Sequence, residues 1–297
     1  MPNRMEKKLT PGTGIVILLA CSTLFASNHV AARIAFDHGA SVAAAVALRA
    51  AGTALVLLCM IRFQGISLTL PRGLRRPALV AGVLVAVQSY CLFSAVALIP
   101  AALALLVFQT SVMLYVLIGW ASGREAPSMS SLAAMLVALA GLALVLDIRP
   151  GQLAASWAEL GAGVLWAFGG AVSFAFVYYA NAYALKPVDG RLRTFVVTTV
   201  TALLAFAGGG AADALALPRD GTGWIGLALV TAFYCIALST LFVVMPKLPP
   251  TSSVALNFEP IALLALAWIF LGQAVTPAQV VGAFVTVGAI AWMGLRK

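Results

Sequence analysis

Hydrophobic residues run along this chain in long unbroken stretches, separated by short segments that carry charges, Pro and Gly. A helix needs about 20 apolar residues to cross a hydrocarbon layer of about 30 Å. By that measure the sequence predicts ten membrane-spanning helices, at residues 12–35, 40–61, 77–98, 100–120, 129–146, 160–182, 192–210, 223–244, 250–271 and 277–295. The stretches are continuous and do not alternate, which disfavours a transmembrane β-barrel. We therefore expect an all-α integral membrane protein.

The connections between these stretches are short. The longest, Arg62 to Arg76, has about fifteen residues, so no soluble catalytic or nucleotide-binding domain fits between the helices. Residues 1–11 are interpreted as a short cytoplasmic tail. A cleaved signal peptide or lipid anchor at the loose motif Leu18-Leu19-Ala20-Cys21 is disfavoured by the length of the first helix and by the nine that follow.

Composition leads to the same class. Of the 297 residues, 63% are hydrophobic and 9% are charged, against about 45–50% and about 25% in soluble domains. So few charges cannot cover the surface of a soluble globule, and so much apolar surface excludes a disordered chain.

The basic residues predict the orientation of the chain in the membrane. With a cytoplasmic N-terminus, only Arg33, Arg149 and Arg219 lie outside, and Arg49 lies within the second helix. The basic residues inside are Arg4, Lys7, Lys8, Arg62, Arg72, Arg75, Arg76, Arg124, Lys186, Arg191, Arg193, Lys247, Arg296 and Lys297. This bias places both termini in the cytoplasm. The net charge of +9 therefore reports orientation and attraction to anionic membrane lipids, and does not indicate nucleic-acid binding.

A weak repeat divides the chain into two halves of five helices, residues 12–150 and 151–297. Residues 14–27 align with 163–176 at an offset of 149, and 104–110 (ALLVFQT) with 254–260 (VALNFEP) at an offset of 150. An odd number of helices per repeat makes the second half enter the membrane from the opposite side. Inverted repeats of this kind are typical of secondary transporters, whose substrate sites lie near the midplane between the halves.

The run from Phe25 to Arg33 and the triplet Ala47-Leu48-Arg49 follow one another in the first two predicted helices. They resemble the Trp-Gly-Ser-Asn-Phe-Val-Ala-x-Lys run and the Leu-Arg-Phe motif of the EamA-like members of the drug/metabolite transporter superfamily. The hairpin at 97–102 and the segments 258–260, 271–273 and 276–279 follow the family pattern in the same order. The resemblance implies ten helices in two inverted halves and an alternating-access transporter of the bacterial inner membrane.

The resemblance also implies a substrate class. Family members carry amino acids, other metabolites or drugs, and exporters of aromatic and other amino acids (the YddG type) are the nearest subgroup. The chain departs from the family at His29, Thr110 and Gln273, where an aromatic residue, Pro and Glu are usual. An exporter of amino acids is the leading hypothesis, and a multidrug exporter for lipophilic cations is the alternative.

Two ionisable residues lie in the middle of predicted spans, where a charge costs about 2.5–3.5 kcal/mol on insertion scales. Glu259, followed by Pro260, is a candidate for binding a substrate amine or carrying a coupling proton. Arg49 is predicted to be structural, paired with Glu259 or with helix-end carbonyls, although a substrate carboxylate is a second possible partner.

Uncharged polar and aromatic residues complete the candidate substrate-binding site. They are Asn28, His29, Gln88, Tyr90, Gln109, Trp166, Tyr234 and Asn257, with Pro100 and Pro260 shaping the cavity. In a regular helix Asn257 lies about 200° around the axis from Glu259, so only one of the two would face the cavity.

Other function classes lack their motifs. The sequence has no phosphate-binding Gly-rich loop, nucleophile elbow or metal-binding spacing, so no cofactor, metal or enzymatic activity is expected. An intramembrane enzyme would have to use His29 with Glu259, which are predicted to lie in different halves at different depths. A structural scaffold is a weaker alternative still. The expected partners are a small-molecule substrate and membrane lipids, and the chain is expected as a monomer or homodimer.

Overall fold

A computed structural model describes residues 11–124, 126–146, 153–212, 214–248 and 250–295, and all regular structure within them is helical. Eight of these helices are long and apolar enough to cross a membrane: Gly12–Asp37, Val42–Phe63, Arg72–Leu98, Ala101–Ala121, Leu160–Ala184, Gly190–Ala211, Gly221–Val244 and Val254–Leu271. Two shorter apolar helices, Met129–Val145 and Pro277–Met293, lie at the predicted fifth and tenth spans. The prediction of an all-helical multi-pass membrane protein is confirmed at this level.

The helices follow the apolar stretches along the chain. The first six are α1 (Pro11–Asp37), α2 (Val42–Phe63), α3 (Arg72–Leu98), α4 (Ala101–Phe108), α5 (Thr110–Ala121) and α6 (Met129–Val145). They are followed by α7 (Leu153–Tyr179), the short π-helix η1 (Ala180–Ala184), α8 (Gly190–Ala211), α9 (Gly221–Val244), the 3₁₀ turns η2 (Met245–Lys247) and η3 (Pro250–Phe258), α10 (Glu259–Leu271) and α11 (Pro277–Leu295). The predicted tail before Pro11 and the predicted boundary between residues 150 and 151 lie outside the described residues.

The fourth and ninth predicted spans each consist of two helical segments. The fourth is interrupted at Gln109, where the hydroxyl of Thr110 donates to the carbonyl oxygen of Val107 at 2.8 Å. Such local hydrogen bonds compete with the helix ladder. In the ninth, a 3₁₀ helix changes to an α-helix at Glu259, directly before Pro260, which has no backbone N–H to donate. Both interruptions lie mid-way along apolar stretches.

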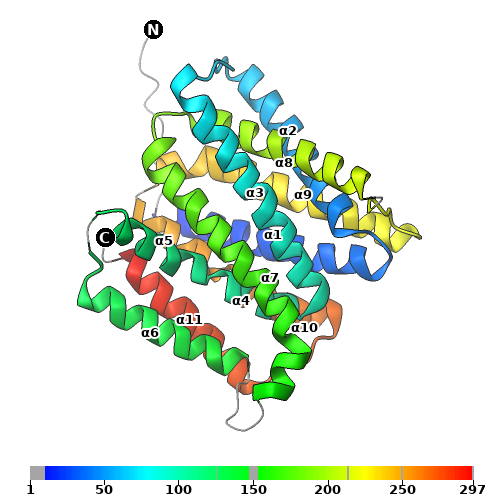
Figure 1. The fold of residues 1–297 in the computed structure, drawn as a ribbon, viewed down its shortest axis with the longest axis vertical. Helices are drawn as coiled ribbons and strands as arrows, with labels where there is room; N and C mark the ends of the chain where they lie inside the picture. Colours follow the sequence, from blue (N-terminus) through cyan, green and yellow to red (C-terminus); the bar gives the residue numbers. More distant parts are fainter. Residues whose placement is uncertain (1–10, 125, 147–152, 213, 249, 296–297) are drawn as a thin grey trace.

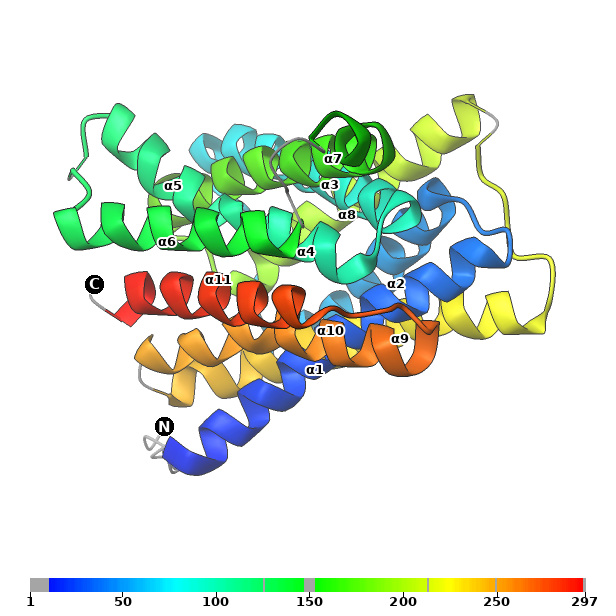
Figure 2. The same cartoon turned by 90° about the horizontal axis from the view of Figure 1, so that it is seen from below.

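Helices from the beginning and the end of the chain pack against one another throughout the molecule. α1 packs on α9, α3 on α7, α2 on α8 and α6 on α11. In Figure 1 the α2–α8 pair and the α6–α11 pair lie at opposite edges of the bundle, with the other helices between them. Figure 2 shows α6 and α11 side by side again from below, and α1 beside α9 and α10. The two parts of the chain are thus interleaved.

Small residues permit these close approaches. A Cβ atom added to Gly226 of α9 would lie 3.0 Å from the carbonyl oxygen of Ala31 on α1, and one added to Gly170 of α7 would lie 3.4 Å from the carbonyl oxygen of Gln88 on α3. Membrane helices associate through such contacts because lipid provides no hydrophobic drive.

The two ends of the bundle are packed differently. We call the end where α1 begins the N-terminal end, and the end where α3 passes into α4 through Ile99 and Pro100 the hairpin end. All eight residues of α4, which leads away from the hairpin end, are buried. By contrast, residues 252 and 254–258 of η3, toward the N-terminal end, are all partly exposed. The structure is therefore more tightly closed at the hairpin end.

Candidate functional site

The helices next to the two interruptions pack against each other in the interior of the molecule. α10, which begins at Glu259, packs against α4, which ends just before Gln109, and also against α1. Both Gln109 and Glu259 are partly exposed although they lie mid-way along apolar segments. A discontinuous helix frees backbone groups and lets polar side chains reach a common point, as in transporter binding sites.

His29 of α1 and Glu259 of α10 form an ion pair at this point if the imidazole is protonated. The Nε2 atom of His29 lies 3.3 Å from Oε1 of Glu259, with the histidine side chain buried and that of the glutamate 24% exposed. The prediction that these residues lie at different depths is wrong, because the interleaved packing of α1 on α10 brings them to one level. This pair joins the early and late parts of the chain.

Arg49 of α2 is buried among aromatic rings. Its Nη2 donates to the hydroxyl of Ser89 on α3 at 2.9 Å, and its guanidinium carbon lies 4.6 Å from the ring centre of Phe93 and 4.5 Å from that of Tyr234. Of the partners considered for Arg49, Glu259 is paired with His29 instead. Arg49 is held by a hydroxyl and two cation–π contacts.

One aromatic ring connects these polar groups. Phe93 has the imidazole of His29 edge-on at 6.0 Å between ring centres, while the guanidinium of Arg49 lies over its face. Tyr234 is contacted in the same way by Arg49 and, edge-on, by Phe25 of α1 at 5.5 Å. We call His29, Glu259, Arg49, Phe93 and Tyr234, with the adjacent Asn28, the central cluster.

Two polar atoms of the central cluster are buried without a hydrogen-bond partner among the described residues. They are Oδ1 of Asn28 and Nδ1 of His29. Buried polar atoms almost always have partners, so each exception needs an explanation such as an absent ligand or water. Asn257 is close in sequence and partly exposed, but it lies in the 3₁₀ helix η3, so the angle of 200° predicted from regular α geometry does not apply.

A row of aromatic side chains lies beside the central cluster. The ring of Phe174 lies 5.2 Å from Phe108 and 4.5 Å from Tyr178, and Tyr178 lies 6.0 Å from Tyr115. Phe108 and Phe174 also pack in one buried cluster with Val30 of α1 and Ala262 of α10. We call the four aromatic residues the aromatic row. It gives the site an apolar wall next to a carboxylate.

The other predicted site residues lie elsewhere. Tyr90 and Trp166 contact each other edge-on at 6.0 Å and are 44% and 40% exposed on the outer surface, where Trp166 lines a groove between α3 and α7. Gln88 is buried on α3 and accepts a hydrogen bond from Ser89 at 3.4 Å. Pro100 precedes α4 at the hairpin end, and Pro260 is buried at the start of α10. Tyr90 and Trp166, both predicted to bind substrate, are therefore paired with each other at an exposed position.

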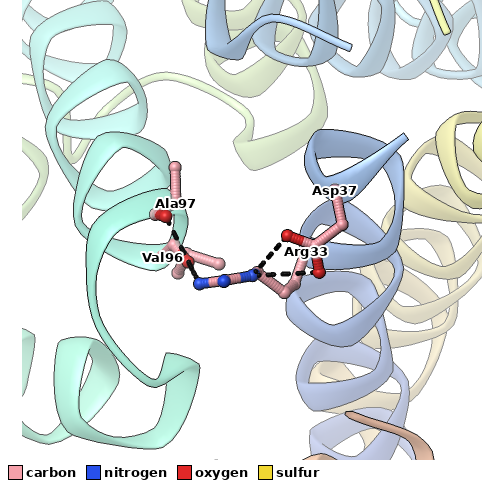
Figure 3. A network of polar contacts seen from close by, with 4 residues as sticks. All are labelled: Arg33, Asp37, Val96 and Ala97. Carbon is pink, nitrogen blue, oxygen red and sulfur yellow. Dashed lines mark hydrogen bonds and ion pairs between the residues drawn. The ribbon is translucent and has the colours of Figure 1, made fainter. Parts of the chain in front are cut away.

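The hairpin end is closed by a polar network on Arg33 (Figure 3). Nη1 of this α1 residue donates to the carbonyl oxygens of Val96 and Ala97 at 3.1 and 3.3 Å, and its Nε donates to both carboxylate oxygens of Asp37 at 3.0 and 3.2 Å. Carbonyls in the last turn of a helix have no intrahelical donor, so a guanidinium satisfies them well. We call this network the Arg33 clasp.

A second contact holds α1 to α9 at the same end. Nδ1 of His38 lies 2.7 Å from Oδ2 of Asp220, and the backbone N–H of Gly223 donates to Oδ1 of that residue at 2.9 Å. The Gly223 hydrogen bond and then the His38 contact hold the pKa of the Asp220 carboxyl below its usual value. Asp220 therefore stays ionised as the N-cap of α9.

Part of the chain is similar to a known protein family. Residues 12–147 match the EamA-like transporter family. A solved structure titled "Crystal structure of protein" superposes with a TM-score of 0.68 at 20% identity, covering 96% of this chain and 99% of that one. At this identity the similarity shows a shared fold alone. No curated protein matches the chain.

The EamA-like region supports the superfamily assigned from the motifs and contains most of the central cluster. Asn28, His29, Arg49 and Phe93 lie within it, Tyr234 and Glu259 beyond it. The site thus needs both parts of the chain.

Sequence analysis did not assign Ser89, Phe93, Phe25 or the four residues of the aromatic row to the site. Ser89 and Phe93 both contact Arg49 and are four residues apart on α3. Phe25 and His29 are likewise four residues apart on α1. This spacing puts them on one helix face and was the available signal. Within the described residues, no group of three His, Cys, Asp or Glu residues could hold a metal ion.

Proposed function

We propose that this protein is a secondary transporter that exports amino acids across the bacterial inner membrane by alternating access. It has ten membrane-spanning segments in two inverted repeats, residues 12–150 and 151–297, with both termini in the cytoplasm. The single observation that carries the proposal is the His29–Glu259 pair at a helix interruption, between α1 and α10.

The packing of the helices supports the inverted repeats. If the halves are repeats, α1 corresponds to α7, α3 to α9, and α4 with α5 to α10. The α1–α9 contact then has its counterpart in the α7–α3 contact, and the α1–α10 contact in those of α7 with α4 and α5. The α2–α8 and α6–α11 contacts are their own counterparts. At the offsets of the sequence repeat, Gln109 corresponds to Glu259 and Tyr178 to His29. The repeats thus supply equivalent positions with different chemistry.

The site chemistry favours an amphipathic substrate with a cationic group. The partly exposed carboxylate of Glu259 suits an ammonium, and the unpartnered Oδ1 of Asn28 provides a further acceptor. The aromatic row offers stacking surface to an apolar side chain. Amino acids combine these features. A lipophilic cation would use the same carboxylate and the same rings, so it is the competing substrate class.

Counterflow in proteoliposomes tests the proposal. Vesicles loaded in turn with Phe, Trp, Thr, Met or a cationic dye are assayed for accelerated uptake of the labelled amino acid. Acceleration by the amino acids is expected. Acceleration by the dye with none by any amino acid would replace this proposal with the drug-exporter hypothesis.

The variant Glu259→Gln tests the role of the ion pair. Loss of the charge should lower the apparent affinity for amino acids by about ten-fold or more, the usual effect of removing a charged hydrogen-bond partner. Asp189→Asn is the control, because Asp189 pairs with Arg191 on the exposed surface between η1 and α8. Undiminished counterflow by Glu259→Gln would exclude Glu259 from substrate binding.

A further inference from the structure

Arg49 is a buried cation whose charge is not balanced by a carboxylate. It is only 8% exposed, and the ion pairs among the described residues join His29 to Glu259, Arg33 to Asp37, His38 to Asp220 and Arg191 to Asp189. None of them includes Arg49. Buried charges in proteins are normally paired, and charges within a membrane are almost always paired or functional.

Arg49 also has unused hydrogen-bonding capacity. A guanidinium has five N–H donors in a planar fork, and among the described residues that of Arg49 makes one hydrogen bond, to Ser89. The rings of Phe93 and Tyr234 face its positive charge but accept no conventional hydrogen bond. The fork matches the two oxygens of a carboxylate.

The position of Arg49 places it within the same site as the ion pair. The His29 imidazole and the Phe93 ring form a T-shaped pair, and the guanidinium of Arg49 lies over the same ring, so both groups contact one aromatic side chain. Tyr234, whose ring also lies against the guanidinium of Arg49, is partly exposed, as is its neighbour Phe25. Movement of the Tyr234 ring would open Arg49 to the interior.

We propose that Arg49 binds the carboxylate of the transported substrate, with Tyr234 as its movable cover. The inference rests on the proposed function and extends it: Glu259 recognises the ammonium and Arg49 the carboxylate, so the site selects zwitterions over simple amines. Arg49 is then a specificity-determining residue, where the sequence predicted a structural one.

Three ligands with one phenyl group separate the two charges. Phenylalanine has both, 2-phenylethylamine lacks the carboxylate and 3-phenylpropanoate lacks the ammonium. Each is used to compete with labelled phenylalanine in counterflow, for the parent protein and for Arg49→Gln and Arg49→Lys. The readout is the ratio of apparent affinities for phenylalanine and 2-phenylethylamine, which a merely structural role would not change.

In Arg49→Gln we expect this ratio to fall by about ten-fold to a hundred-fold, because a charged hydrogen-bond partner is lost for one ligand only. Arg49→Lys keeps the charge without the fork and should restore part of the ratio. Arg191→Gln, at the start of α8 where Arg191 pairs with Asp189, should leave the ratio unchanged. Ser89→Ala, which removes the group that holds the guanidinium, provides a milder variant should Arg49→Gln fail to fold, and should lower the ratio less.

The outcomes distinguish this inference from the proposed function. If the parent protein exchanges phenylalanine but the ratio is the same in Arg49→Gln and Ser89→Ala as in the parent, Arg49 does not bind the carboxylate and the transport proposal stands. If the parent exchanges the amine but neither carboxylate-containing ligand, both proposals fail.

Discussion

Gly282 of α11 and Gly141 of α6 meet face to face where these two helices cross. A Cβ atom added to Gly282 would lie 2.5 Å from the carbonyl oxygen of Gly141, and one added to Gly141 would lie 2.8 Å from that of Gly282. The hydroxyl of Thr286 donates across the same contact to the carbonyl oxygen of Ala138 at 3.3 Å. Backbone therefore packs directly on backbone, which any side chain would prevent.

Gly282→Ala should lower the free energy of unfolding by about 1–3 kcal/mol, the usual cost of overpacking. The matched control is Gly288→Ala on the same helix, where an added Cβ would meet no atom within 4 Å. That variant should stay within about 1 kcal/mol of the parent, since alanine has the higher helix propensity. Thermal unfolding in detergent measures both. Equal stability of the two variants would contradict the close contact.

Among the helices, the interruption between α4 and α5 is the feature that most affects the site. Thr110 is the first residue of α5, a position whose backbone N–H is not needed in the ladder of that helix. Val112, two residues later, donates its N–H to the carbonyl oxygen of Gln109 at 3.2 Å. The sequence repeat aligns Thr110, the first residue of α5, with Pro260, the second residue of α10.

Thr110→Pro should therefore be tolerated, with a stability within about 1 kcal/mol of the parent and counterflow retained. Val112→Pro should destabilise the protein by about 3 kcal/mol, because it removes a hydrogen bond and its ring clashes with the preceding turn. Thermal unfolding and counterflow of the two variants give the comparison. Similar damage from both would mean that α4 and α5 act as one continuous helix.

At the scale of the whole molecule, the closure of the hairpin end must be reversible if substrate is to leave there. The Arg33 clasp joins α1 to the last turn of α3, and all of α4 behind it is buried. Access to the site from that end requires α1 and α3 to separate. The clasp then stabilises the state seen in this structure relative to a state open at the hairpin end.

Arg33→Gln should shift the equilibrium toward that open state. Ala102 at the start of α4 is buried, so Ala102→Cys should react slowly with a membrane-impermeant maleimide in the parent and several-fold faster, about 5–10-fold, when Arg33→Gln is added. Ala216→Cys, which is exposed at the same end, is the control and should react equally in both. Unchanged labelling of Ala102→Cys would show that the clasp does not contribute to closure.

The sequence determined the protein class and most of the helices. Long apolar runs with 9% charged residues leave a multi-pass helical protein as the stable solution, because backbone polar groups in lipid must be satisfied within each segment. The mid-span positions of Glu259 and Arg49 also drew attention to them, Glu259 as a candidate for function and Arg49 as a structural residue, because a charge within the membrane is costly.

The tertiary structure decided which of these groups meet. His29 and Glu259 are 230 positions apart in the sequence, and nothing local specifies that they lie within 3.3 Å. Their contact depends on the packing of α1 on α10. It also depends on the change from 3₁₀ to α geometry at Glu259, because side chains in a 3₁₀ helix point in other directions than they would in a continuous α-helix. The faces of Tyr90 and Trp166 were undecidable for a related reason: helices that are apolar all round carry no stripe to show which side faces lipid.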